Sequence, residues 1–419
     1  MVFDKSVSTE LDNLCSLASE NKLNYNMVLY AAQLAPLKSL AVSDIVDYLR
    51  NNGVSVIYDE SLVEEDAPSE DVKPFDPSKV NIIEPPMTMD SLIKRIENDE
   101  IEFSSDFQRK AGLWDDGQKS RLIESVLLRI PLPAFYFDAT DDDKWVIIDG
   151  LQRTTAIRDF IVNQSLALKK LEFFTDLNGK KFNDLPRSFQ RRIEETHILA
   201  YKVCPPTPSN VKFNIFKRLN TSGLTLEPQE IRNALYQGSA TKFLAVVSKS
   251  TAFVKATGSK VSSDRMLDRE FVLRFIAFCY YGFDKYDGDI ESFLNNTMDW
   301  LNKQSLIFQD DIAQEFDRVM ELAYSIFGTY AFQKLNSSGR HNTINKAVFV
   351  DWCYVLHNIK GDRAKKLVQN KDTIKKMFTK LCETRAELWN SSSRSAMYTQ
   401  FSIINTRIRQ QIFGEVEND

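Results

Sequence analysis

The sequence of 419 residues contains no run of about 18 consecutive apolar residues, the length that a bilayer-spanning helix needs. Its first residues, MVFDKSVSTELDN, also lack the charged and then apolar pattern of a secretory signal peptide. These two absences argue against a membrane-bound or secreted protein. We therefore expect a cytoplasmic protein with no membrane partner.

Histidine and cysteine are scarce. The three histidines, His197, His341 and His357, do not occur in a metal-ligand spacing, so no metal site is predicted. The five cysteines are scattered and form no Cys-x-x-Cys pair, which excludes a disulfide framework or a zinc ribbon as an expectation. We expect these thiols to be reduced and mostly buried.

The chain has no excess of positive charge, because 53 basic residues stand against 58 acidic ones and the formal net charge is -5. Indiscriminate coating of DNA needs a basic surface. Any contact with nucleic acid must therefore be local. The 43% of hydrophobic residues can form a sizeable core, and the length of 419 residues is enough for two or three compact units.

Changes in pattern along the chain predict an α+β fold class with four segments. Helical apolar spacing and a brief strand at Val54–Ile57 predict a small three-helix module over residues 1–62. Acidic residues and prolines predict a linker over residues 63–80. Short alternating strands and helices predict a small mixed domain over residues 81–236, and long amphipathic stretches predict a mainly α-helical domain over residues 237–419.

The mixed segment has three strand candidates, which are Ile101–Phe103, Phe135–Phe137 and Trp145–Ile148. Apolar spacing from Leu122 to Ile130 predicts a helix between them, and Pro131 and Pro133 stop it because proline supplies no backbone donor. The helical segment is predicted from the stretches Phe271–Tyr281, Ile307–Phe327 and Asn345–Leu356.

The N-terminal segment LDNLCSLASENKLNYNMVLYAAQL, with SDIVDYLRNNGVSVIYDES after it, resembles region 1.1 of primary bacterial sigma factors. The resemblance rests on helix spacing, and a generic three-helix module explains the same pattern. If it holds, it implies an acidic module that occupies a DNA-binding channel and blocks it.

The clearest local signal for chemistry is the strand candidate Trp145–Ile148 followed by Asp149, Gly150 and a helix start. Unpaired N–H groups and the helix dipole make such a turn an anion site. Arg153 in the first turn can hold a phosphate through two parallel bonds, and Thr154 and Thr155 can add hydroxyl donors. Asp149 can orient Arg153, hold a metal through a phosphate, or simply cap the helix.

This turn resembles the Asp-Gly-Gln-Gln-Arg signature of the ParB-like N-terminal domain of GmrSD restriction enzymes. Three further segments agree in order: Phe107-Gln108-Arg109 with Trp114, then Lys119–Ser125 with Pro131-Leu132-Pro133, and then Phe216–Gly223 with Leu226 and Glu230. The resemblance implies a nucleotide-binding fold, and it implies that relatives hydrolyse the nucleotide to control DNA cleavage.

Carried over to this sequence, the resemblance implies a nucleoside triphosphate ligand, with Mg²⁺ as a candidate companion. The candidate catalytic residues are Asp149, Gln152 and Arg153. The candidate nucleotide-binding or phosphate-binding residues are Gln108, Arg109, Lys119, Gly150, Thr154, Asn220 and Thr221.

Several of these residues have a simpler structural explanation. Lys119 can belong to a solvated helix face, and Asn220 and Thr221 can cap a helix that ends before Gly223. Glu230 stands near a helix start, where a carboxylate is favoured anyway. Leu151 replaces the first Gln of the family signature and removes one amide, which makes nucleotide binding better supported than hydrolysis.

The favoured hypothesis is a nucleotide-binding protein, a candidate NTPase, that acts on or regulates DNA in a restriction or anti-phage setting. Arg340-His341-Asn342 is an unconvincing His-Asn-His motif, so a nuclease would be a separate subunit. One alternative is a non-enzymatic regulator that binds RNA polymerase or a DNA-binding partner through its acidic N-terminus. Another alternative is that the signature turn binds the phosphodiester backbone of DNA. A homo-oligomer is compatible with each hypothesis.

Overall fold

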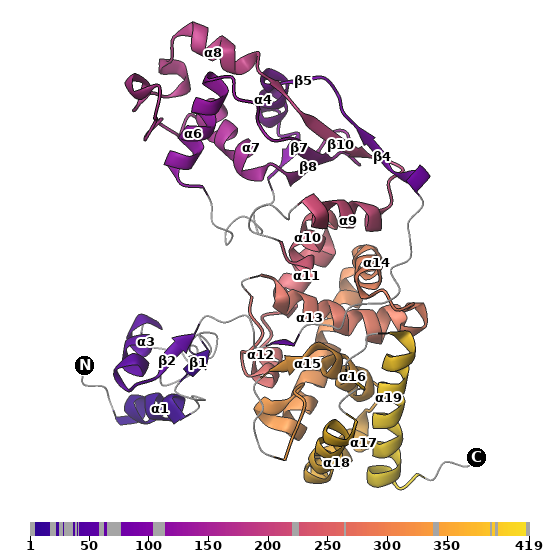
Figure 1. Ribbon diagram of the computed structural model, residues 1–419. Coiled ribbons are helices and arrows are strands. Elements are labelled where there is room, and N and C mark those ends of the chain that lie inside the picture. The colour runs from indigo at the N-terminus through magenta and orange to yellow at the C-terminus, as the bar shows by residue number, and fades with distance from the viewer. Residues whose placement is uncertain are drawn as a thin grey trace. The chain divides into compact units, whose positions relative to one another are not determined.

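The structure is a computed structural model, and it describes residues 5–16, 22–24, 28, 37, 40, 42–57, 63–64, 77–103, 114–219, 226–263, 265–337, 343–385, 388–389 and 393–415. The chain divides into two compact units (Figure 1). One unit is Pro74–Gln237, which we call the mixed unit. The other combines Met1–Lys73 with Gly238–Asp419, and we call it the helical unit.

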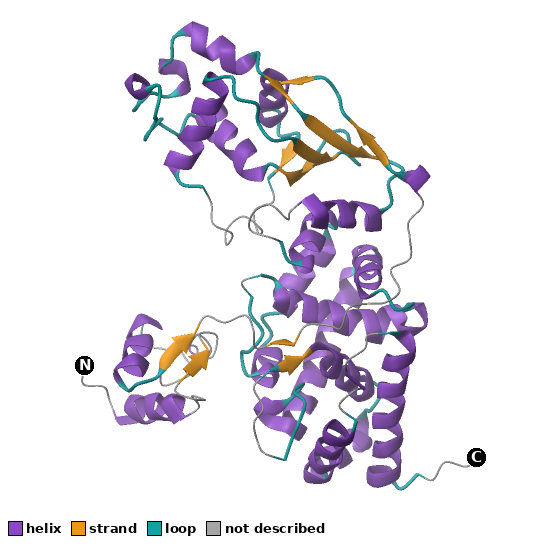
Figure 2. Cartoon of the chain, in the orientation of Figure 1, coloured by secondary structure: helices purple, strands orange, loops and turns teal. Residues whose placement is uncertain are grey.

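The mixed unit is built on a five-stranded sheet with the order β4-β10-β7-β8-β6 (Figure 2). β7 and β8 pair antiparallel, β6 and β10 are added in parallel on their two outer sides, and β4 pairs antiparallel with β10. The strands are β4 (Asn81–Ile83), β6 (Ile101–Glu102), β7 (Phe135–Asp138), β8 (Trp145–Asp149) and β10 (Ala200–Cys204). A separate antiparallel pair joins β5 (Met87–Thr88) to β9 (His197–Ile198).

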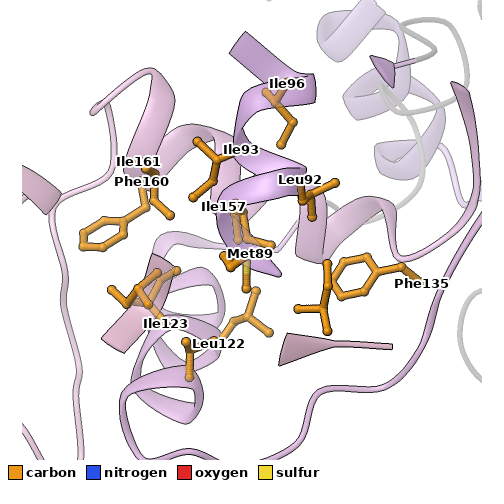
Figure 3. Close-up of a cluster of buried hydrophobic side chains, with 14 of the residues drawn as sticks. Met89, Leu92, Ile93, Ile96, Leu122, Ile123, Phe135, Ile157, Phe160 and Ile161 are labelled. Carbon is orange, nitrogen blue, oxygen red and sulfur yellow. The ribbon is translucent and has the colours of Figure 1, made fainter. Parts of the chain in front are cut away.

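Helices pack on both faces of this sheet because apolar residues alternate along β8. Trp145 and Ile147 belong to one core cluster, whereas Ile148 belongs to another with Phe213 and Phe216. The first core lies under α4 (Met89–Glu97), α6 (Asp116–Leu127), α7 (Leu151–Ile157) with its π-helical continuation η3 (Arg158–Val162), and α8 (Arg187–Glu194) (Figure 3). The second lies under α9 (Ser209–Leu219) and α10 (Pro228–Leu235).

Two buried polar contacts, neither anticipated from the sequence, hold the mixed unit together. Lys212 on α9 places its Nζ atom 3.0 Å and 3.1 Å from the two carboxylate oxygens of Asp138 at the end of β7. Both side chains are more than 90% buried. Since an unpaired buried charge is costly, this ion pair fixes α9 against the sheet.

Glu124 on α6 organises the loop that carries residues 172–174. Its carboxylate accepts the backbone N–H groups of Glu172, Phe173 and Phe174 at 3.0, 2.8 and 2.9 Å. Burial by itself would raise the pKa of Glu124, but the three backbone N–H donors outweigh burial, and its pKa lies below the ordinary value of 4.5. The charged carboxylate is therefore part of the folded structure.

In the helical unit, the described part of residues 1–57 contains α1 (Lys5–Ser16) and α3 (Val42–Asn51). A parallel strand pair, β1 (Lys22–Asn24) with β2 (Ser55–Ile57), accompanies these helices. β2 agrees with the predicted strand, and β1 lies between the apolar patterns of the first two predicted helices, at residues for which no element was predicted. The resemblance to sigma region 1.1 stays a prediction.

The rest of the helical unit is mainly α-helical, as predicted, and α15 covers the stretch predicted from Ile307 to Phe327. β3 (Val63–Glu64) pairs in parallel with β11 (Ile344–Asn345), although a linker was predicted at residues 63–80. The principal helices are α11 (Ser239–Val247), α12 (Thr251–Thr257), α13 (Leu267–Ile276), α14 (Ile290–Asn302), α15 (Leu306–Phe327), α16 (Lys346–His357), α17 (Gly361–Gln369), α18 (Lys371–Thr384) and α19 (Arg394–Ile408), which continues as the π-helix η10 (Arg409–Phe413).

Within the described residues, no helix has the length and apolar character needed to cross a membrane. The five cysteines are free thiols, but only Cys353 and Cys382 are buried, and the other three are half-buried. The same described residues contain no group of three or more potential metal ligands among His, Cys, Asp and Glu.

Candidate phosphate site at the Asp149–Gly150 turn

The turn between β8 and α7 requires glycine. Gly150 has φ 100° and ψ 12°, a left-handed conformation that other residues rarely adopt. A Cβ atom at this position would also lie 2.8 Å from Cδ1 of Phe135. The chain can therefore pass directly from a buried strand into a helix only because position 150 has no side chain.

The first turn of α7 has no side-chain cap. Gly150 is the N-cap residue, and its carbonyl accepts the N–H of Thr154 at 2.8 Å, which begins the helical bonding. The preceding N–H groups of such a helix have no partner within the helix itself. Asp149 does not cap the helix, so the capping explanation is replaced by a contact with Arg153.

Arg153 is turned inward. Its Nη2 atom donates to Oδ2 of Asp149 at 2.7 Å, and its Nη1 atom donates to the carbonyl of Pro133. The guanidinium also lies over the ring of Phe135, 4.9 Å from its centroid, and only 9% of the residue is exposed. The expected phosphate clamp is thus engaged by protein groups, because side chains near a helix N-terminus tilt back towards the preceding residues.

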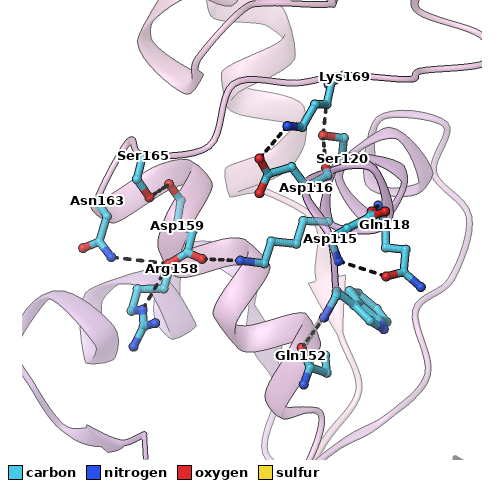
Figure 4. Close-up of polar contacts among 12 residues, drawn as sticks. Asp115, Asp116, Gln118, Ser120, Gln152, Arg158, Asp159, Asn163, Ser165 and Lys169 are labelled. Atoms are coloured by element: carbon cyan, nitrogen blue, oxygen red, sulfur yellow. Dashed lines mark hydrogen bonds and ion pairs between the residues drawn. The ribbon is translucent and has the colours of Figure 1, made fainter. Parts of the chain in front are cut away.

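Gln152 connects this turn to another predicted segment. Its Oε1 atom accepts the backbone N–H of Trp114 at 3.2 Å, which leaves its amide N–H₂ as a donor (Figure 4). The contact places Trp114, which lies five residues after the Phe-Gln-Arg segment, beside the turn. Gln108 and Arg109 themselves lie outside the described residues.

Lys119 on α6 is held in a largely buried ion pair. Its Nζ atom lies 2.7 Å from Oδ2 of Asp159, and both side chains are only 15% exposed. The same carboxylate accepts longer bonds of 3.4 Å from Arg158 and Asn163 (Figure 4). Lys119 therefore does not lie on a solvated helix face but joins α6 to η3, and its ammonium group already has a carboxylate partner.

Other predicted residues also have structural partners. The Thr154 hydroxyl is buried and donates to the Gly150 carbonyl at 3.0 Å, as part of the helix start. Glu230 accepts the backbone N–H of Glu227 at 2.8 Å, which agrees with its explanation as a helix-start carboxylate. Asn220 and Thr221 lie outside the described residues.

A cavity of about 960 Å³ occurs in the helical unit and is lined by none of the predicted residues. Aromatic side chains, among them Phe283, Tyr354 and Tyr398, form part of its wall, and the polar residues Asp284 and Arg394 form another part. Sequence reasoning missed it because its lining comes from segments more than 100 residues apart.

The mixed unit is thus an α+β domain in which a buried strand turns at a glycine into an uncapped helix. Residues 90–237 match the family described as the GmrSD restriction endonuclease N-terminal domain, and this part of the chain belongs to that family. The match covers most of the mixed unit and confirms the resemblance based on the four segments. No curated protein and no solved structure matches the chain.

Proposed function

We propose that this protein binds the phosphates of a nucleoside triphosphate at residues 149–155, and that it serves as a nucleotide-responsive component of a restriction or anti-phage system. The family supports the setting, because its description is that of a restriction endonuclease domain. The single observation that carries the proposal is the uncapped α7 start at Gly150.

Phosphate suits this turn for two physical reasons. N–H groups at a helix start point outward and carry partial positive charge, which favours an anion. Gly150 also adopts the left-handed conformation that turns the buried strand directly into the helix start, which places these N–H groups at the end of β8. Asp149 and Arg153 would act as positioning residues that hold the turn, with Gln152 offering its amide N–H₂ group.

We propose Arg109, a phosphate-binding candidate from the sequence, as the source of positive charge for the ligand, because the Arg153 guanidinium is already bonded to Asp149 and Pro133. Arg109 lies five residues before Trp114, whose N–H is bonded to Gln152. Five extended residues span at most about 18 Å, which limits the distance between Arg109 and Trp114. The inward contact of Lys119 with Asp159 gives Lys119 a structural role.

The bound nucleotide would also be hydrolysed slowly. A magnesium ion would come with the phosphates, and Asp149, whose Oδ1 atom has no hydrogen bond within the described residues, would be the residue of the turn to hold it. Leu151 packs against the core where the family signature has a Gln, so turnover would be slow. DNA cleavage would belong to a separate nuclease subunit.

The direct test is thermal unfolding of the whole protein with ATP, GTP, CTP or UTP and magnesium. A ligand that binds only the folded state stabilises it by about 2.7 kcal/mol at one hundred times its Kd. We expect at least one nucleotide to raise the Tm, and we expect Arg109→Ala to remove that rise.

Lys94→Ala is the matched control, because Lys94 lies on the exposed side of α4 and pairs with Asp90 at the surface. It should leave the nucleotide-induced shift unchanged. If no nucleotide shifts the wild-type protein, or if Arg109→Ala shifts like wild type, the proposed site is wrong.

A further inference from the structure

A basic groove lies in the helical unit between the end of α18 and the α19–η10 helix. It encloses about 440 Å³ and is lined by Arg385, Ser402, Thr406, Arg407, Gln410 and Gln411. Leu381 and Ile403 complete its wall. We call it the Arg385–Arg407 groove.

The chemistry of this groove is one-sided. Among the described residues, two guanidinium groups line it and no carboxylate does. Arg385 is exposed, Arg407 is half-buried, and in the part of the chain that the structure describes neither guanidinium has a hydrogen bond or an ion pair. Guanidinium groups only donate, and their geometry matches the oxygens of a phosphate. The amides and hydroxyls beside them add further donors.

The groove also lies in a strongly basic part of the sequence. Residues 360–415 contain twelve basic and five acidic side chains, although the whole chain carries a net charge of -5. Three of these acids are engaged elsewhere: Asp362 pairs with Lys365 at 2.8 Å, Glu415 with Arg363, and Glu383 with the backbone and hydroxyl of Ser337. The positive charge around the groove is therefore not neutralised locally by these carboxylates.

We propose that the Arg385–Arg407 groove binds the phosphodiester backbone of double-stranded DNA. A single free phosphate would satisfy the two arginines, but α18, whose end forms one side of the groove, also carries Lys371, Lys375, Lys376 and Lys380 against two acidic residues, so positive charge continues along this helix. Backbone contacts of this kind give affinity without sequence preference. The proposal goes beyond the nucleotide site and does not rest on it.

The test uses the full-length protein and a fluorescein-labelled DNA duplex, with anisotropy measured over a range of salt concentrations. We expect the double variant Arg385→Ala/Arg407→Ala to bind at least about tenfold more weakly at low salt. We also expect the slope of log K against log salt to fall by roughly two units, because about one counterion is released per phosphate contact.

The matched control is Lys242→Ala/Lys249→Ala, which removes the same charge from exposed positions on and beside α11 in the same unit. It should retain wild-type affinity and slope. Circular dichroism and Tm of both variants should equal wild type, because the arginines have no intramolecular partner to lose within the described residues.

Three outcomes would overturn the proposal: no duplex binding by the wild type, equal weakening by the two double variants, or unchanged binding by Arg385→Ala/Arg407→Ala. Titration with inorganic phosphate distinguishes a DNA backbone from a free phosphate ion as the ligand of the groove. Binding of phosphate without binding of the duplex would mean that the groove is a site for a free anion. Nucleotide-induced Tm shifts, measured on the same variants, report on the turn at Gly150 independently.

Discussion

Arg153 and Asp149 form an ion pair of 2.7 Å that folds the first turn of α7 back onto the end of β8. The pair connects the two halves of the signature, since the carboxylate closes the strand and the guanidinium belongs to the helix. It is also largely removed from solvent on the arginine side, where 10% of the side chain is exposed. The signature therefore has a structural function whatever it binds.

Arg153→Ala should destabilise the mixed unit by about 1–3 kcal/mol, because the Pro133 carbonyl and the Asp149 carboxylate lose a charged donor. Urea denaturation measures the change. Arg153→Lys should recover only part of it, since an ammonium group cannot reproduce the planar fork. An unchanged midpoint in Arg153→Ala would mean that these contacts are not formed in solution.

Gly150→Ala should cost at least about 1 kcal/mol more than Gly179→Ala. Both glycines have positive φ, at 100° and 84°, so the backbone strain is similar. Only the Cβ atom at position 150 meets Phe135, whereas a Cβ atom at position 179 meets nothing within 4 Å. Chemical denaturation of the two variants gives the difference directly, and equal losses would contradict the close approach at the turn.

Leu151→Gln restores the amide of the family signature, and we expect it to raise nucleotide-dependent phosphate release by about tenfold, because a positioned polar group contributes to catalysis. Leu151→Met keeps the apolar contact with the core and serves as the control. Phosphate release by purified protein measures both. If neither variant differs from wild type, position 151 does not limit hydrolysis.

Lys119→Met should lower stability by about 1–3 kcal/mol and leave nucleotide affinity unchanged, since the Lys119–Asp159 pair is mostly buried. The control is Lys169→Met, which breaks the contact between Lys169 and Asp116 of α6. Both side chains of this second pair are about half exposed. This control should cost at most about 1 kcal/mol. A loss of nucleotide binding in Lys119→Met, with stability intact, would return Lys119 to the ligand site.

Stability should depend on pH through Glu124. Its folded-state pKa is lowered, so its contribution is fully present above the ordinary value of 4.5 and is lost as the pH falls through the lowered pKa. Glu124→Gln should therefore be less stable than wild type at neutral pH, by about 1–3 kcal/mol, and the gap should close in acid.

Glu97→Gln is the control for this measurement, because Glu97 is exposed at the end of α4. Its denaturation midpoint should follow that of wild type from neutral to acid pH. A constant gap between Glu124→Gln and wild type over the same range would show that the carboxylate charge is not what stabilises the loop.

The local parts of this protein could be predicted from the sequence. The pattern at Trp145–Ile148 followed by Gly150 predicts a strand, a turn and a helix, and the structure has β8, a left-handed glycine and α7 in that order. Such features depend on neighbouring residues, whose periodicity and backbone preferences are visible in sequence. The family of residues 90–237 was recognisable for the same reason.

The partners of the charged side chains were decided only by tertiary structure. Nothing near Lys119 in sequence indicates Asp159, 40 positions away, and nothing near Asp138 indicates Lys212. Arg153 was predicted to face a phosphate and is instead turned towards Pro133 and Asp149. An exposed charge and a buried ion pair have the same local sequence, and the packing of distant elements determines which of them forms.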